Sequence, residues 1–236
     1  MEVGLPSGIL GTLCIYGDFM RKTEFTEGEY YHIYNRGTDK REVFLDEADF
    51  ERFLESMTAF NTLDPIGSIY ENYFRKKQLG SRTSKNGSNK KLINIVAYCL
   101  NPNHYHFILQ QLTEKGIEKF MQRLGTGYTK YFNNRYGRSG VLFQGKFKSI
   151  HITSNPQLLH VSAYVNLNSR VHQLGSRTSK SSWGEYTGQQ KKVPLCEMSQ
   201  IIGQFHSPEE YQAFAENSVQ GTMARRGLLE EDLLME

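Results

Sequence analysis

The hydrophobic pattern of this chain predicts an α+β fold, a central antiparallel sheet with helices packed on it. Short segments rich in aromatic and β-branched residues predict strands, and longer segments with apolar residues every three or four positions predict helices. They follow one another as strand, helix, two strands, helix, strand and helix. This order is the split βαβ pattern of ferredoxin-like domains, which places the pair of consecutive strands at the centre of the sheet.

The first strand and helix are expected before residue 62. Residues 30–35 predict the strand, because most of them are aromatic or β-branched. A helix is expected over residues 47–61, where Asp46 suits an N-cap and apolar residues recur at helical spacing. Residues 62–91 contain Pro, Gly and many polar residues, so we expect a long basic loop there.

Two apolar strands are expected at residues 92–100 and 104–112. Residues 101–103 between them are Asn, Pro and Asn, which have turn chemistry, so the two strands should form a hairpin. Apolar residues at helical spacing then predict a long helix over residues 117–132, which the glycines that follow should end.

The last elements of the main domain are a strand or ribbon over residues 141–152 and a third helix over residues 155–170. Pro156 supports the start of that helix, because proline is favoured in its first turn. We expect residues 20–172 to form one domain. A polar loop over residues 173–190 and a short helix at residues 208–217 should then make up a C-terminal extension, 173–236. Residues 1–19 lack the basic and continuous apolar regions of a signal peptide, and we expect a disordered segment or a mis-assigned start.

Charge is distributed unevenly along the chain. The net charge is only +3, from 28 Lys and Arg against 25 Asp and Glu. Residues 75–91 nevertheless carry seven basic side chains and no acidic one, and residues 115–148 carry eight against one, whereas 207–236 hold seven acids and two arginines. Such segregation favours a middle region that binds a polyanion, although basic residues that merely coat solvated faces would give the same pattern.

The cysteines and the apolar runs exclude several classes of protein. The three cysteines are odd in number and widely spaced, so they imply neither a disulfide framework nor a zinc cluster. No apolar run approaches the ~20 residues that span a bilayer. We therefore expect a cytoplasmic protein with no membrane partner.

An eight-residue segment, QLGSRTSK, occurs twice, at residues 78–85 and 173–180. So short and polar a segment cannot make a structural repeat. Our hypothesis is that a repeated DNA element has been read through into two tolerant loops.

His104 and His106 are the strongest local signal for chemistry. On a strand, residues two apart point to the same face, about 7 Å apart along the chain, where they are able to hold one divalent cation. Two surface histidines on a half-exposed strand would show the same spacing. The apolar residues around the pair favour the metal interpretation, because buried polar side chains need a partner.

Tyr164 and Asn168 are four residues apart and therefore adjacent on one face of the third predicted helix. An amide oxygen is able to complete a two-histidine metal site. A phenol beside it would be a nucleophile, if a cation polarised the group that it attacks. Taken alone, Tyr164 would be interpreted as a packing residue.

Together these residues resemble the HUH single-tyrosine transposases of insertion sequences, in particular the branch of the REP-associated tyrosine transposases. The resemblance covers about residues 24–172 and rests on four stretches. They are YYHIYNRG at residues 30–37, AYCLNPNHYHF at 97–107, FQGKFK at 143–148 and YVNLN at 164–168.

The resemblance implies both a ferredoxin-like sheet and a reaction. Mg²⁺ or Mn²⁺ would be bound by His104, His106 and Asn168, and Tyr164 would attack a phosphate of single-stranded or hairpin DNA. The products would be a 5′-phosphotyrosine and a free 3′-OH, which allows strands to be rejoined without ATP. One departure is Ser169, which stands where relatives often have proline. Within the family, dimers are common among insertion-sequence members and monomers among REP-associated ones, and we expect a dimer here.

Basic side chains of the long helix and the following ribbon would hold DNA phosphates. These are Arg123, Lys130, Arg135, Arg138, Lys146 and Lys148. Tyr128 of the same helix is a rival to Tyr164 as nucleophile, but residue 132, four positions later, is Phe rather than an amide.

Three alternatives remain open at the level of sequence. A non-catalytic or domesticated nucleic-acid-binding protein would also suit an aromatic-rich sheet, but the aromatic motif of RNA-recognition domains is absent. An HUH replication initiator or relaxase shares the chemistry, although 236 residues leave no room for a helicase. A metal-dependent hydrolase would not need Tyr164.

Overall fold

The computed structural model describes residues 24–67, 69, 90–172, 179–190 and 194–234. Two predictions fall outside this part of the chain. One is that residues 1–19 are disordered or mis-assigned, and the other is that most of residues 62–91 form a basic loop that includes the first copy of the duplicated segment.

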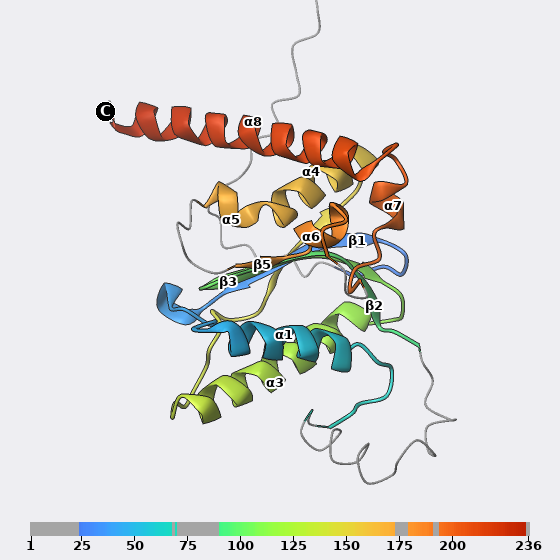
Figure 1. Ribbon diagram of the computed structural model, residues 1–236. Helices are drawn as coiled ribbons and strands as arrows, with labels where there is room; N and C mark the ends of the chain where they lie inside the picture. Colours follow the sequence, from blue (N-terminus) through green and yellow to red (C-terminus); the bar gives the residue numbers. More distant parts are fainter. Residues whose placement is uncertain (1–23, 68, 70–89, 173–178, 191–193, 235–236) are drawn as a thin grey trace, which may run out of the picture.

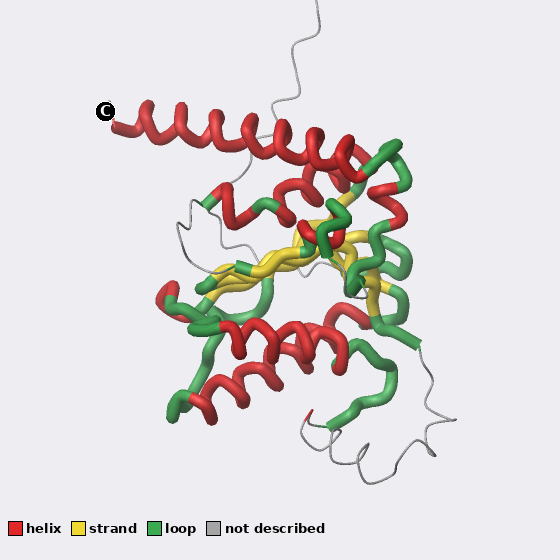
Figure 2. Tube along the Cα trace, in the orientation of Figure 1, coloured by secondary structure: helices red, strands yellow, loops and turns green. Residues whose placement is uncertain are grey.

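A five-stranded sheet forms the middle layer, in the order β4-β1-β3-β2-β5 (Figures 1 and 2). Its strands are β1 (Tyr30–Arg36), β2 (Ile93–Asn101), β3 (His104–Gln111), β4 (Lys148–Ile152) and β5 (Lys180–Ser181). Every neighbouring pair is antiparallel. The predicted α+β class and the central position of the β2–β3 hairpin are confirmed.

Helices cover both faces of the sheet (Figure 1). On one face lie α1 (Glu47–Ala59) and α3 (Gly116–Arg135), and on the other α4 (Asn155–Asn166), α5 (Asn168–Val171) and α8 (Pro208–Leu234). Three short segments complete the described elements: η1 (Thr38–Lys40), α6 (Trp183–Tyr186) and α7 (Ser199–Ile202).

Each face of the sheet has its own hydrophobic core, and the alternation of β3 separates them. Tyr105, Phe107 and Leu109 are buried in the core under α1 and α3. Ile108 is buried in the core under α4 and α8. Successive strand residues point to opposite faces. The even-numbered residues of β3, which include both predicted metal ligands, therefore face α4.

Helix starts follow the local sequence. Asp46 is the N-cap of α1, as predicted, and its Oδ1 accepts from the backbone N–H of Asp49 at 3.1 Å. Ser154 caps α4 in the same way, with a 3.4 Å bond from the N–H of Gln157, and Pro156 occupies the first turn. Each cap satisfies a backbone donor that the helix itself leaves unpaired.

The third predicted helix is interrupted. Leu167 has φ −107° and ψ 17°, outside the helical region, so α4 ends at Asn166 and α5 begins at Asn168. The N–H of Leu167 still donates to the carbonyl of Ala163 at 3.0 Å. The break reorients the backbone at the residue that was predicted to bind metal.

The C-terminal extension differs most from the prediction. Residues 179–190 contain β5 and α6 rather than a polar loop, and α8 extends to Leu234 rather than ending near residue 217. Buried polar contacts explain α6: the hydroxyl of Tyr186 donates to the carbonyl of Val96 at 2.8 Å, where a register shift interrupts the β2–β3 pairing. A hydrophobic pattern does not show such a bond in advance.

The second copy of the duplicated segment ends inside the sheet. Lys180, its last residue, pairs with Leu100 of β2, and its Nζ lies 2.7 Å from Oε1 of Glu47. Residues 173–178 lie outside the described part. This end of the segment therefore has a structural role that our loop hypothesis did not include.

None of the described helices is both long enough and apolar enough to cross a membrane.

A buried carboxylate joins α1 to α3. Asp49 is fully buried, and its two oxygens accept from Arg135 Nη1 at 2.9 Å, Tyr131 Oη at 3.1 Å, Tyr136 Oη at 2.9 Å and the N–H of Leu45 at 2.8 Å. These four donors offset the cost of removing the charge from water.

Because Asp49 is fully buried and accepts from four donors, Asp49→Ala should lower the free energy of unfolding by about 3 kcal/mol. Urea denaturation followed by circular dichroism measures this. Glu51→Ala, an exposed change in the same helix, is the control and should stay within about 0.5 kcal/mol of the unsubstituted protein. Equal stability of the two variants would contradict this role of Asp49.

Candidate metal and tyrosine site

His104 and His106 lie side by side on the face of β3 that α4 covers. Their ring centroids are 5.3 Å apart and the ring planes are nearly perpendicular, at 88°. His106 is buried, and His104 is partly buried. Burial lowers the pKa of His104, a hydrogen bond with Asn168 opposes this, and the charge of Arg36 adds to it. A lowered pKa favours the neutral imidazole, the form that binds a metal.

Neighbouring amides fix the proton of His104. Its Nδ1 lies 2.6 Å from Oδ1 of Asn103, an acceptor, so Nδ1 carries the hydrogen and donates. On the other side of the ring, Nε2 accepts from Nδ2 of Asn101 at 2.9 Å. Both contacts are made by the neutral tautomer with its hydrogen on Nδ1, whereas a hydrogen bond from Nε2 to Oδ1 of Asn168, 3.2 Å away, needs the protonated ring. The lone pair of Nε2 therefore faces the site.

His106 is held by a histidine of the adjacent strand. Its Nδ1 lies 2.9 Å from Nε2 of His32 in β1, and the two rings stack with centroids 5.1 Å apart. Burial lowers the pKa of His32 to about 4, so His32 is neutral at pH 7. One of the two nitrogens carries the shared hydrogen. When Nδ1 of His106 carries it, the lone pair of this ring is on Nε2, the nitrogen that would bind a metal.

Asn168 brings an amide oxygen to the histidines. It is fully buried, and its Oδ1 lies 3.2 Å from Nε2 of His104 and 2.7 Å from Nδ2 of Asn101. Two donors in neighbouring positions around Mg²⁺ are about 3 Å apart, because each bond is about 2.1 Å long. The side-chain nitrogen of Asn168 is buried without a hydrogen-bond partner. Both the spacing and the donor chemistry fit a divalent cation.

Tyr164 lies one turn before Asn168, and it approaches the same group of residues, the cluster formed by His104, His106 and Asn168. Its ring is 5.7 Å from that of His106 and 6.0 Å from that of His32, with the planes at 90° and 81°. The side chain is partly exposed. The structure thus brings together the four residues that the sequence proposed for catalysis and metal binding, although α4 ends between Tyr164 and Asn168.

The rival tyrosine lies elsewhere. Tyr128 of α3 is fully buried on the opposite face of the sheet, where its hydroxyl donates to the carbonyl of Val43 at 2.6 Å. Burial, which is the largest cause, raises its pKa. A buried phenol with a raised pKa and an internal partner is not placed to attack DNA.

Five residues that contact the histidines were not predicted: His32, Tyr34, Asn101, Asn103 and His172. Tyr34 of β1 stacks on His106 with centroids 5.6 Å apart, and burial and the neighbouring Tyr164 raise its pKa. The alternation of β1 offered a signal, because His32 and Tyr34 are two residues apart and share a face. The pairing of β1 with β3 is what brings that face to His106.

The six basic residues that were predicted to bind DNA lie on different parts of the molecule. Arg123, Lys130 and Arg135 belong to α3, on the face opposite the histidines. Arg123 donates to the carbonyls of Thr62 at 2.5 Å and Leu63 at 3.2 Å. Arg138, after this helix, lies 5.6 Å from the centroid of the Phe132 ring.

Lys146 is exposed in the loop before β4. Lys148, in β4, is placed differently from the other five. It pairs with Tyr34 of β1, which in turn pairs with His106, and residues directly opposite in antiparallel strands point to the same side. Arg36 pairs with His104 in the same way, and both Lys148 and Arg36 are exposed. Two exposed cations therefore share the face that carries the histidines. Lys148 was predicted to bind DNA, and Arg36 was not.

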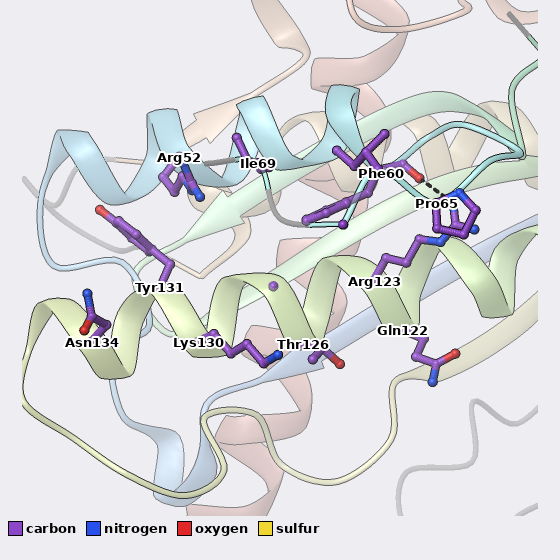
Figure 3. A pocket seen from close by; sticks show the side chains of 13 residues that line it. Arg52, Phe60, Pro65, Ile69, Gln122, Arg123, Thr126, Lys130, Tyr131 and Asn134 are labelled. Carbon is purple, nitrogen blue, oxygen red and sulfur yellow. Dashed lines mark hydrogen bonds between the residues drawn. The ribbon is translucent and has the colours of Figure 1, made fainter. Parts of the chain in front are cut away.

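A cavity of about 1000 Å³ lies beside α3 on the opposite side of the sheet (Figure 3). Its lining includes Arg52 of α1, Phe60 and Pro65 after that helix, and Arg123 and Lys130 of α3. None of the residues that line it belongs to the histidine cluster. The cavity is thus separate from the candidate metal site.

Comparison with known proteins finds similarity to transposases. The family model "Transposase IS200 like" matches residues 72–169. A solved structure of a REP-associated tyrosine transposase bound to a REP hairpin is similar, with 14% identity and a TM-score of 0.44 over 77% of this chain and 90% of that one. No curated protein matches. The family match spans less than half of the chain and includes His104, His106, Tyr164 and Asn168, so this part of the chain is similar to IS200-like transposases.

Proposed function

We propose that this protein is a transposase that cuts and rejoins single-stranded DNA through a covalent tyrosine intermediate. The observation that carries the proposal is the convergence of Tyr164 with His104, His106 and Asn168 at one cluster. The family match supports the general activity. The tautomer of His104 and the spacing of its Nε2 from Asn168 Oδ1 support the metal ligands.

The chain's own residues have separate tasks in the reaction. Tyr164 Oη attacks phosphorus, the bond from phosphorus to the 3′ oxygen breaks, and that oxygen takes up a proton to become a 3′-OH. His104, His106 and Asn168 would hold Mg²⁺ or Mn²⁺, which would polarise the scissile phosphate and stabilise its charge. The 5′-phosphotyrosine retains the energy of the broken bond. A 3′-OH is therefore able to attack it and restore a DNA strand.

Single-stranded or hairpin DNA is the proposed substrate. Lys148 and Arg36 are the exposed cations that share a face with the histidines, and they would hold backbone phosphates there. Arg123 and Arg135 are less suited, because the protein's own carbonyls and carboxylates already occupy their donors. A cytoplasmic location, a dimer and the proposed domain limits remain predictions.

Two other functions use the same face. A domesticated DNA-binding protein would need the cations but not Tyr164, and a replication initiator or relaxase would share the whole cluster. A metal-dependent hydrolase would cut DNA without a covalent intermediate. The hydrogen bonds of His32, Asn101 and Asn103 to the two histidines favour a catalytic site, because a surface that only binds DNA would not need the ring nitrogens of these histidines oriented.

The covalent intermediate tests the proposal. Wild-type protein mixed with labelled single-stranded hairpin DNA and Mn²⁺ should give a protein–DNA adduct that survives denaturing electrophoresis. Tyr164→Phe should reduce adduct formation by at least about a thousandfold, because it removes the nucleophilic oxygen. Tyr34→Phe is the matched control: it keeps the ring on His106 and should keep the adduct. An adduct that persists in Tyr164→Phe and disappears in Tyr34→Phe would move the nucleophile to Tyr34.

DNA binding should depend on Lys148 more than on Arg135. Lys148→Ala should weaken binding of a single-stranded oligonucleotide and reduce by about 1 the slope of log affinity against log salt concentration, because one phosphate contact is lost. Arg135→Ala should leave the slope unchanged and instead lower the melting temperature, because Asp46 and Asp49 lose their partner. Fluorescence anisotropy at several salt concentrations distinguishes the two. The same reduced slope in both variants would indicate a second DNA surface along α3.

His32 should act as a positioning residue for His106. His32→Phe should weaken Mn²⁺ binding about 10- to 100-fold, which is typical when the outer partner of a metal-bound histidine is removed. His32→Gln keeps an acceptor and should recover part of the affinity. Electron paramagnetic resonance counts free Mn²⁺ during a titration. Unchanged affinity in His32→Phe would show that packing alone orients His106.

A further inference from the structure

A third imidazole lies beside the proposed metal ligands. His172 follows α5 directly, and its ring centroid is 5.0 Å from that of His104, with the planes at 73°. The ligand nitrogens of His104, His106 and His172 all lie within 4.8 Å of one another. The chain has seven histidines, and three of them meet at this point.

The backbone ties His172 to Asn168. The N–H of His172 donates to the carbonyl of Asn168 at 3.1 Å, so one short helical turn carries both side chains to the cluster. His172 is exposed, whereas His106 and Asn168 are buried. The imidazole therefore approaches the site from the solvent side, and the other donors approach it from the sheet and from α5.

The spacing suits one ion after a small movement. Two nitrogens bound to one cation by bonds of about 2.1 Å are about 3.0 Å apart in octahedral and about 3.4 Å apart in tetrahedral geometry. Nitrogens within 4.8 Å of one another approach this range. Rotations about the χ angles of these side chains would close the remaining gap.

We propose that His172 is a fourth protein ligand of the metal, so that three imidazoles and one amide oxygen form the site. This rests on the metal binding of the proposed function and adds a consequence for the choice of ion. Imidazole ligands suit Co²⁺, Ni²⁺ and Zn²⁺, whereas Mg²⁺ prefers oxygen ligands. The third imidazole thus shifts the preference of the site away from Mg²⁺ and toward these ions.

Co²⁺ alone, titrated into the full chain without DNA, tests this ligand set by calorimetry and visible absorption. Wild type should bind one Co²⁺ with a spectrum set by its nitrogen ligands. His172→Ala should bind about tenfold or more weakly and change the spectrum, as when other groups that support a metal site are lost. Competition with Mg²⁺ should show a smaller preference for Co²⁺ in His172→Ala. This readout does not depend on activity.

Two controls separate the possible failures. His160→Ala removes an exposed histidine of α4 that lies outside the three-histidine group, and it should bind Co²⁺ like the wild type. His104→Ala should abolish binding. Unchanged affinity, spectrum and ion preference in His172→Ala would overturn this inference and leave the proposed function intact. If wild type bound no Co²⁺ and no Mn²⁺, the metal site of the proposed function would fail, and this inference with it.

Discussion

The register of β3 between its two neighbours is the constraint on which this structure depends. The strand is central, so one set of alternate residues enters the core under α1 and α3, and the other set faces α4. A shift of one residue would move His104 and His106 into that core and Tyr105 and Phe107 out of it. The hydrophobic burial that stabilises the fold therefore also orients the two histidines, and no separate interaction is needed to select their face.

Burial has a second effect, on protonation. The imidazoles of His32 and His104 lie on the side of the sheet that α4 covers, and their charged forms are poorly solvated there. For His32 and His104 burial lowers the pKa, so both favour the neutral form at neutral pH. Neutral rings are able to act as donors to one partner and acceptors from another, which is how Asn103 and Asn101 hold His104. The network is thus arranged around lone pairs rather than charges.

Much of the fold and part of the site could be predicted from sequence. Strand and helix patterns are local, and so are the spacings of His104 with His106 and of Tyr164 with Asn168. His32, Asn101 and His172 were missed, because their contacts depend on strand pairing and on a helix break that periodicity does not show. The partners of the basic residues of α3 could not be predicted from sequence either. Their spacing indicates a charged helix, but only the packed structure shows that Arg135 meets buried Asp49 on the far side of the sheet.

The C-terminal extension completes the argument, because it holds the helix that carries Tyr164. Tyr211 of α8 is fully buried, and its hydroxyl lies 2.9 Å from Nδ2 of Asn166 and 3.1 Å from Oγ of Ser162, both in α4. Ser182, next to β5, donates to Oδ1 of Asn166 at 2.6 Å. These bonds fix α4 from the side away from the histidines, on both sides of Tyr164 in sequence. Since α4 contacts the sheet on one face and α8 on the other, the distance from Tyr164 to His106 depends on residues far outside the motifs. The extension is therefore part of the framework that positions the nucleophile.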